Sequence, residues 1–168
     1  MMSDDTTPRL ALPLLQPGQA QKETTHNEAL ALLDLAVQAS VLAVGTNVPP
    51  ANPVAGDAWI VGGAPTGGWA GQARAIAGWT SSGWRFVAPR DGMAVWSVAD
   101  GQVARSAGGV WTLGVLAGSR VSISGVDVVG ARREAIVEPS GGPVVDLDAR
   151  AAIGAILAAL RGHGLISI

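Results

Sequence analysis

The chain has 168 residues, of which 48% are hydrophobic and only 14% are charged, and its formal net charge is −2. A chain of this length can bury one ordinary core or two small modules, and its lack of cysteine excludes disulfide bonds and thiolate metal sites and fits folding in the cytoplasm. Its eleven Lys and Arg residues are dispersed, which argues against a nucleic-acid-binding face because phosphate neutralisation needs clustered cations.

The low charge also bears on assembly. A typical globular chain is roughly 25% charged, so this chain has few charges with which to cover its surface. We expect it to bury surface against other copies of itself, as an obligate homo-oligomer. An Ala- and Gly-rich monomer is the alternative.

The first expected parts are a disordered tip at residues 1–9 and an anchoring segment with a helix at residues 10–50. Thr25 is followed three residues later by Glu28, a capping-box pattern that predicts a helix beginning near His26. Apolar residues at spacings of three and four predict one continuous helical stripe, formed by Leu30, Leu33, Val37, Val41 and Val44. Further apolar residues widen this stripe, so we expect the helix to be buried on more than one side and to end near Gly45.

A polar cluster comes just before and within the start of this helix. Its members are Gln19, Gln21, Lys22 and Asn27. Amide side chains can hydrogen-bond the backbone across an interface without burying net charge. We expect an interface role for this cluster, and local capping and turn formation is the alternative.

Residues 51–116 predict a Trp- and Gly-rich β module. Short apolar segments recur between glycine-containing turns, which is typical of an antiparallel meander that rolls into a small sandwich or barrel. The expected strands are 57–61, 74–79, 84–88, 93–98, 102–104 and 110–113.

Additional strands and a Pro/Gly linker are expected at residues 117–143, followed by a C-terminal helix and tail at residues 144–168. Asp146 or Asp148 is the expected N-cap of this helix. Its apolar stripe includes Ile153, Ile156 and Leu160, which suits self-association; packing on its own domain is the alternative. The apolar stretch spans only about 18 Å as a helix, too short for a bilayer core, so we expect no membrane insertion.

The sequence offers little for catalysis. Its two histidines, His26 and His163, are far apart in the sequence, and no nucleophile elbow or nucleotide-binding motif is present. We therefore expect no metal, no cofactor and no catalytic residue. Asp57, Asp91 and Asp100 could in principle supply two carboxylates for glycoside hydrolysis, but Asp91 and Asp100 each precede a glycine, which favours a role in turns.

Six tryptophans stand beside one phenylalanine and no tyrosine. Indole faces stack on sugar rings, while the indole N–H can bond a hydroxyl group. Trp69, Trp79 and Trp84 lie nearest the glycine-rich turns and are the candidate sugar contacts. Filling of the module's own core is the alternative for each of them.

Several strings in the chain carry a resemblance to a family. They are Gln19-Ala20-Gln21-Lys22, Thr25-His26-Asn27-Glu28-Ala29-Leu30 and Leu33-Asp34. With further matches along nearly the whole chain, they resemble the N-terminal signature of an uncharacterised family of alphaproteobacterial prophages and gene transfer agents. The chain departs from this pattern at Pro17 and Glu23.

The resemblance implies a structural virion protein, a head spike or tail fibre assembled in the bacterial cytoplasm, with no catalytic residues to carry over. It implies adsorption to the capsular polysaccharide of a host cell, as a trimer by default or a pentamer at a capsid vertex. With the residues, it predicts an α+β chain that binds itself, other particle proteins and host polysaccharide. An architectural connector for another receptor-binding protein and a polysaccharide depolymerase are the alternatives.

Overall fold

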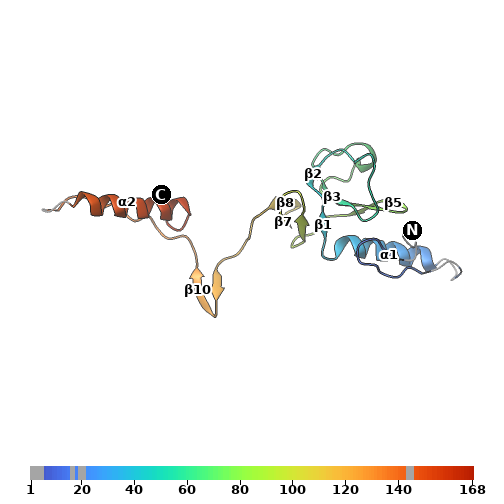
Figure 1. Cartoon of the computed structure of the whole chain (residues 1–168), viewed down its shortest axis with the longest axis horizontal. Helices are drawn as coiled ribbons and strands as arrows, with labels where there is room; N and C mark the ends of the chain where they lie inside the picture. The colour runs from blue at the N-terminus through green and yellow to red at the C-terminus, as the bar shows by residue number, and fades with distance from the viewer. Residues whose placement is uncertain (1–5, 16–17, 19–21, 143–145) are drawn as a thin grey trace. The chain divides into compact units, whose positions relative to one another are not determined.

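The structure, a computed structural model, describes residues 6–15, 18, 22–142 and 146–168. The chain divides into two compact units, Met1–Val115 and Leu116–Ile168. In the part of the chain that the structure describes, the first unit contains one α-helix and eight strands, and the second contains a two-stranded hairpin and one α-helix (Figure 1). The predicted α+β architecture, with a helix near each end of the chain and β structure between them, is confirmed.

The first unit contains two four-stranded sheets, ordered β1-β6-β7-β8 and β2-β3-β4-β5. All six strands that the sequence predicts between residues 51 and 116 are present. Hairpins join β4 to β5, β6 to β7 and β7 to β8 as an antiparallel meander. The bounds are β1 Ser40–Val41, β2 Val44–Thr46, β3 Ala58–Val61, β4 Ile76–Thr80, β5 Gly83–Val87, β6 Ala94–Ser97, β7 Gln102–Ala107 and β8 Val110–Leu113.

The bounds predicted for the first helix were wrong at both ends. Helix α1 spans Lys22–Ala36, so Thr25 lies inside it and the expected capping box does not form its start. The chain leaves the helix at Gln38, whose φ is +45°. Val41 and Val44, expected on the helical stripe, lie instead in β1 and β2, which pair in parallel with β6 and β3. β-Branched residues favour such extended positions.

Helix α1 is also less buried than its apolar coverage predicted. Within it only Asp34 and Leu35 are buried, and Leu33 is 50% exposed. Leu35 joins a core that it shares with both sheets. These core residues are Ile60 and Ile76 of the β2-β3-β4-β5 sheet and Val41, Val95 and Ala104 of the β1-β6-β7-β8 sheet. The helix therefore packs along one narrow line on the β module, within the same compact unit.

The expected disordered tip at residues 1–9 needs a correction from Thr6 onwards, and residues 1–5 lie outside the described part of the chain. Thr7 is only 3% exposed, and its hydroxyl donates to the buried carboxylate of Asp34 at 2.8 Å. The backbone N–H groups of Arg9 and Leu10 donate to the same carboxylate, at 3.0 and 2.5 Å. Asp34 thus binds the N-terminal segment, together with the Arg9 guanidinium, which donates to the carbonyl oxygens of Asp34, Leu35 and Gln38.

In the second unit, β9 (Val121–Ile123) and β10 (Val126–Val129) form an antiparallel hairpin. Helix α2 spans Leu147–Gly162, and the carboxylate of Asp146 accepts the backbone N–H of Ala149 at 2.9 Å. Of the two predicted N-caps, the structure therefore uses Asp146. Among the described residues, no helix combines the length and the hydrophobicity that crossing a membrane requires.

Candidate functional site

Four tryptophans form one cluster on the face of the β2-β3-β4-β5 sheet that faces away from α1. Trp79 and Trp84 are partners across the β4–β5 hairpin, with ring centroids 4.8 Å apart. Trp59 and Trp69 complete the cluster, and their centroids lie 5.7 and 5.1 Å from that of Trp84. Edge-to-face pairs at these distances stabilise packing beyond the burial of area.

The three predicted sugar contacts, Trp69, Trp79 and Trp84, differ in how far they are exposed. Trp69 is completely buried, so its face cannot meet a ligand in this structure. Trp79 and Trp84 are half-buried and pack against the other rings. The reason is a short 3₁₀ turn, η1 (Gly67–Trp69), in which Gly67 has a φ of +56°. The glycines that indicated exposure instead let the chain fold back and turn the indole inwards.

Trp96 on β6 is the most exposed of the six tryptophans, at 47%. It was not among the predicted sugar contacts. Its strand alternates exposed and buried residues, with Val95 and Ser97 buried on either side. That period-two pattern was the signal in the sequence that could have placed Trp96 outside.

On the other side of the sheet, a cavity of about 540 Å³ lies between α1, the N-terminal segment and the β4–β5 turn. Its size is within the range of roughly 300–1,000 Å³ that is usual for small-molecule sites. Its wall combines polar side chains with apolar ones such as Leu14, Ala31 and Ala55, and among the described residues Glu28 and Arg85 are the two charged ones that line it. The lining residues include Thr24, Asn27, Glu28, Thr80, Ser81, Ser82 and Arg85.

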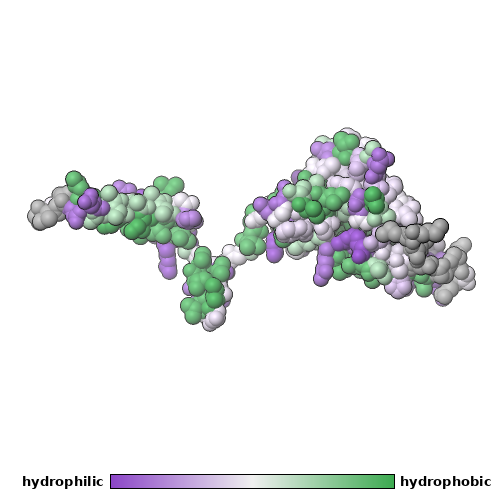
Figure 2. Space-filling model, in the orientation of Figure 1, coloured by the Kyte–Doolittle hydropathy of each residue, from purple (hydrophilic) through white to green (hydrophobic). Residues whose placement is uncertain are grey.

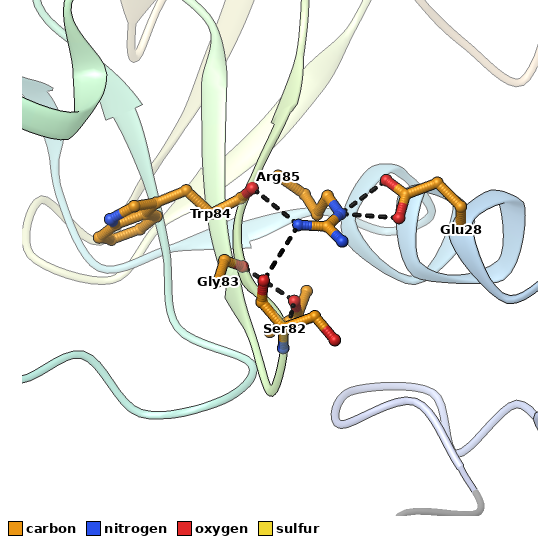
Figure 3. A network of polar contacts seen from close by, with 6 residues as sticks. Glu28, Ser82, Gly83, Trp84 and Arg85 are labelled. Atoms are coloured by element: carbon orange, nitrogen blue, oxygen red, sulfur yellow. Dashed lines mark hydrogen bonds and ion pairs between the residues drawn. The ribbon is translucent and has the colours of Figure 1, made fainter. Parts of the chain in front are cut away.

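Arg85 spans the gap between β5 and α1. Its Nε lies 2.6 and 2.8 Å from the two carboxylate oxygens of Glu28. Its Nη1 donates to the carbonyl oxygens of Trp84 and Ser82, at 3.1 and 3.4 Å. Figure 3 shows the guanidinium pointing towards α1, while the Trp84 ring points to the opposite side of β5. The alternation of side chains along a strand thus separates the polar cavity from the tryptophan cluster.

The sequence patterns did not reveal this pair. They assigned Glu28 to a capping box and residues 81–83 to a plain turn. The available signal was Arg85 itself, a charged residue flanked by Trp84 and Phe86 in a strand that otherwise reads as apolar. Its partner on α1 could not be read from spacing, because 57 positions separate the two residues.

The predicted N-terminal interface cluster divides into three cases. Gln19 and Gln21 lie outside the described residues, and Lys22 is exposed at the first position of α1. The Asn27 side chain contacts the backbone of Leu15, since its Oδ1 accepts the N–H of Leu15 at 2.8 Å and its Nδ2 donates to the Leu15 carbonyl at 3.0 Å. Both bonds lie within the chain and reach a residue 12 positions away, and the interface role of Asn27 stays a prediction.

The remaining predicted interface residues are all apolar. Leu33, in the last turn of α1, is 50% exposed, and Val37, the residue after the helix, is 46% exposed. Leu30 is half-buried. On α2, Ile153 and Ile156 are 42% and 59% exposed, and Leu160 is half-buried.

The three carboxylates considered for glycoside cleavage each hold local structure. Asp57 accepts the backbone N–H of Val54 at 2.8 Å, and Asp91 accepts that of Gly108 at 2.9 Å. Asp100 accepts the hydroxyl of the buried Ser97 at 2.5 Å. Within the described ranges, no group of three or more His, Cys, Asp or Glu side chains could hold a metal ion.

The second unit exposes many apolar side chains. Figure 2 shows hydrophobic residues covering the β9–β10 hairpin and much of α2. Val121, Ile123 and Val126 of the hairpin are 53%, 60% and 64% exposed. Among the hydrophobic residues that the structure describes in this unit, only Leu157 and Ile166 are fully buried.

One protein family matches the chain. It is described as "Protein of unknown function (DUF2793)", and the match covers residues 26–112, which is more than half of the chain. The matched range begins inside α1 and ends in β8, so it includes both sheets of the first unit, the tryptophan cluster and the Glu28–Arg85 pair. No curated protein and no solved structure matches the chain.

Proposed function

The chain belongs to the family described as protein of unknown function DUF2793, and we propose that it is a homo-oligomeric structural protein of a phage or gene transfer agent. In this proposal it is a spike or fibre that attaches the particle to polysaccharide on the host cell surface. The second unit joins copies of the chain, and the first unit meets the host.

The observation that carries the proposal is the exposed apolar surface of the second unit. Isolated two-stranded hairpins are marginally stable in water, and three or more strands or a packed helix are needed for independent stability. Within its own unit, the β9–β10 hairpin has no third strand and no helix packed on it among the described residues. The three residues of β9 and the four of β10 are all exposed. Contiguous exposed apolar surface of this kind marks an interaction site.

A second copy of the same chain is the proposed occupant of this surface. Hairpins from identical subunits can cover one another's apolar faces in a closed, symmetric arrangement. The composition supports the same view, since a chain with 14% charged residues has little else with which to cover this surface. Ile153 and Ile156 on α2 give the helix an apolar stripe that can join the same assembly.

Attachment to polysaccharide rests on the resemblance and on the first unit, which has its own core and a cavity with hydroxyl groups and an ion pair in its lining. Assembly makes weak sugar contacts effective, because several sites on one particle bind with avidity. The test is binding of the purified protein to polysaccharide extracted from the recipient strain, and to cells with and without that polysaccharide. Strong binding to the coated cells alone is expected, while equal binding to both would contradict the polysaccharide as the target.

The architectural connector is the second candidate, and the burial of Trp69 favours it by removing one expected sugar contact. A connector would self-assemble in the same way but would capture another particle protein in place of polysaccharide. Co-purification of the tagged chain from disrupted particles separates the two roles. Retention of a receptor-binding protein, together with no binding to polysaccharide, would favour the connector.

A further inference from the structure

We propose that the cavity between α1 and the β4–β5 hairpin binds an uncharged saccharide through hydrogen bonds from hydroxyl groups and Arg85. This inference rests on the proposed function and deepens it, because it moves the sugar contact from the tryptophan cluster to the opposite side of the sheet. It names the chemistry of the ligand and the residues that hold it.

The charge of the cavity indicates an uncharged ligand. Among the lining residues that the structure describes, Glu28 and Arg85 carry the charges, and they neutralise each other at 2.6 and 2.8 Å. An anionic or cationic ligand would have to compete with the Glu28–Arg85 ion pair. A neutral ligand can instead form hydrogen bonds with the groups of Glu28 and Arg85 that stay accessible, and the ion pair remains intact. Side-chain exposures of 26% for Arg85 and 44% for Glu28 leave the pair accessible to such a ligand.

The hydrogen-bonding groups in the lining fall into two sets. Thr7 and Thr80 are committed to the protein: the Thr7 hydroxyl donates to Asp34, and the Thr80 hydroxyl donates to the Gly83 carbonyl. The hydroxyls of Ser81 and Ser82 have no partner among the described residues, and neither does Nη2 of Arg85. These groups are donors and acceptors that a polyhydroxylated ligand can use.

Arg85 is held in place before any ligand arrives. Glu28 fixes Nε from one side, and the carbonyl oxygens of Ser82 and Trp84 fix Nη1 from the other (Figure 3). Its planar fork therefore loses little side-chain freedom on binding, and its remaining N–H groups have a defined direction. Neighbouring hydroxyls on a sugar ring match this arrangement of a fixed donor beside a carboxylate that can accept.

The volume fits this class of ligand. About 540 Å³ is room for a small molecule or for a short segment of a longer chain. No aromatic ring is among the lining residues that the structure describes, so recognition here depends on hydrogen bonds and not on stacking. A site of this kind is weak by itself and gains strength from repetition in an oligomer.

The experiment measures binding of the full-length chain to an array of immobilised neutral, sialylated and sulfated oligosaccharides, and to the extracted host polysaccharide. Two variants remove the site: Ser81→Ala combined with Ser82→Ala, and Arg85→Met combined with Glu28→Gln. The serine variant changes side chains at a turn, where folding is not at risk. The Arg85 and Glu28 variant removes both members of the ion pair, so no unpaired charge is left behind. Thr112→Val, an exposed change on β8, is the matched control.

Wild type and Thr112→Val are expected to bind neutral oligosaccharides, and both site variants are expected to lose at least tenfold in affinity while keeping the wild-type melting temperature and oligomeric mass. Binding only to charged oligosaccharides, no binding to any sugar, or equal binding by the site variants would overturn the inference. If the site variants still adsorb to host cells, the proposed function stands and only the cavity is excluded. If wild type itself does not adsorb, the proposed function fails as well.

Discussion

Leu35 on α1 fills the space where Gly78 on β4 has no side chain. A Cβ built on Gly78 would lie 2.7 Å from Cδ1 of Leu35 and 2.9 Å from its Cδ2. Both residues are buried, so neither has free room to move. This contact sets how closely α1 approaches β4.

Gly78→Ala is expected to destabilise the first unit by about 1–3 kcal/mol, because an added methyl group in a packed core forces side chains and backbone to shift. Urea unfolding measures the effect. Gly63→Ala is the control, since Gly63 is exposed and a methyl group added there would meet nothing within 4 Å. Equal stability of the two variants would show that α1 does not pack on Gly78 in solution.

Asp34→Ala is expected to release the N-terminal segment. The carboxylate accepts the Thr7 hydroxyl and two backbone N–H groups in a buried place, and hydrogen bonds to a charged group contribute roughly 1.5–3 kcal/mol each. Hydrogen exchange should become fast at the amides of Arg9 and Leu10. Asp148→Asn, an exposed change in the first turn of α2, should leave these amides protected. Continued protection in Asp34→Ala would mean that other contacts hold the segment.

Trp69→Ala is expected to cost about 3–5 kcal/mol, as is usual when a large aromatic side chain is removed from a core. It should also reduce the near-ultraviolet circular dichroism that packed indoles produce. Trp96→Ala is the comparison, because this ring is 47% exposed and should be nearly neutral for stability. A nearly neutral Trp69→Ala would contradict the central place of this ring in the cluster.

Ile156→Asp is expected to dissociate the oligomer without unfolding the chain. Ile156 is 59% exposed on α2, so the charge meets water in a monomer but is buried without a partner in the proposed assembly. Ala158→Asp, two residues away and pointing to another side of the helix, is the control. Sedimentation velocity should show a smaller species for Ile156→Asp alone, and an unchanged species would exclude this stripe from the interface.

The strands were predictable because their signals are local. Alternating apolar residues and glycine turns mark β3 to β8 within a few residues of their observed bounds. The end of α1 was not predictable in this way, because Val41 and Val44 continue the helical spacing by chance. Their place in β1 and β2 depends on parallel pairing, of β1 with β6, which is distant in the sequence, and of β2 with β3, the next strand of the chain.

The cavity and the burial of the tryptophans depend on the same kind of distant contact. Spacing correctly singled out a Trp-rich module, but it gave no sign that Trp69, which lies outside the strands, would be buried. The ring of Trp69 is covered because the β3–β4 loop folds over the sheet. The site around Arg85 exists because α1 crosses the hairpin at Glu28.

The mass of the full-length chain in solution tests the central claim most directly. Light scattering at micromolar concentration is expected to give a whole-number multiple of the 16.9 kDa subunit, three or more, that stays constant on dilution. A mass of one subunit at that concentration would contradict the account, because the apolar surface of the second unit would then have no second copy to cover it.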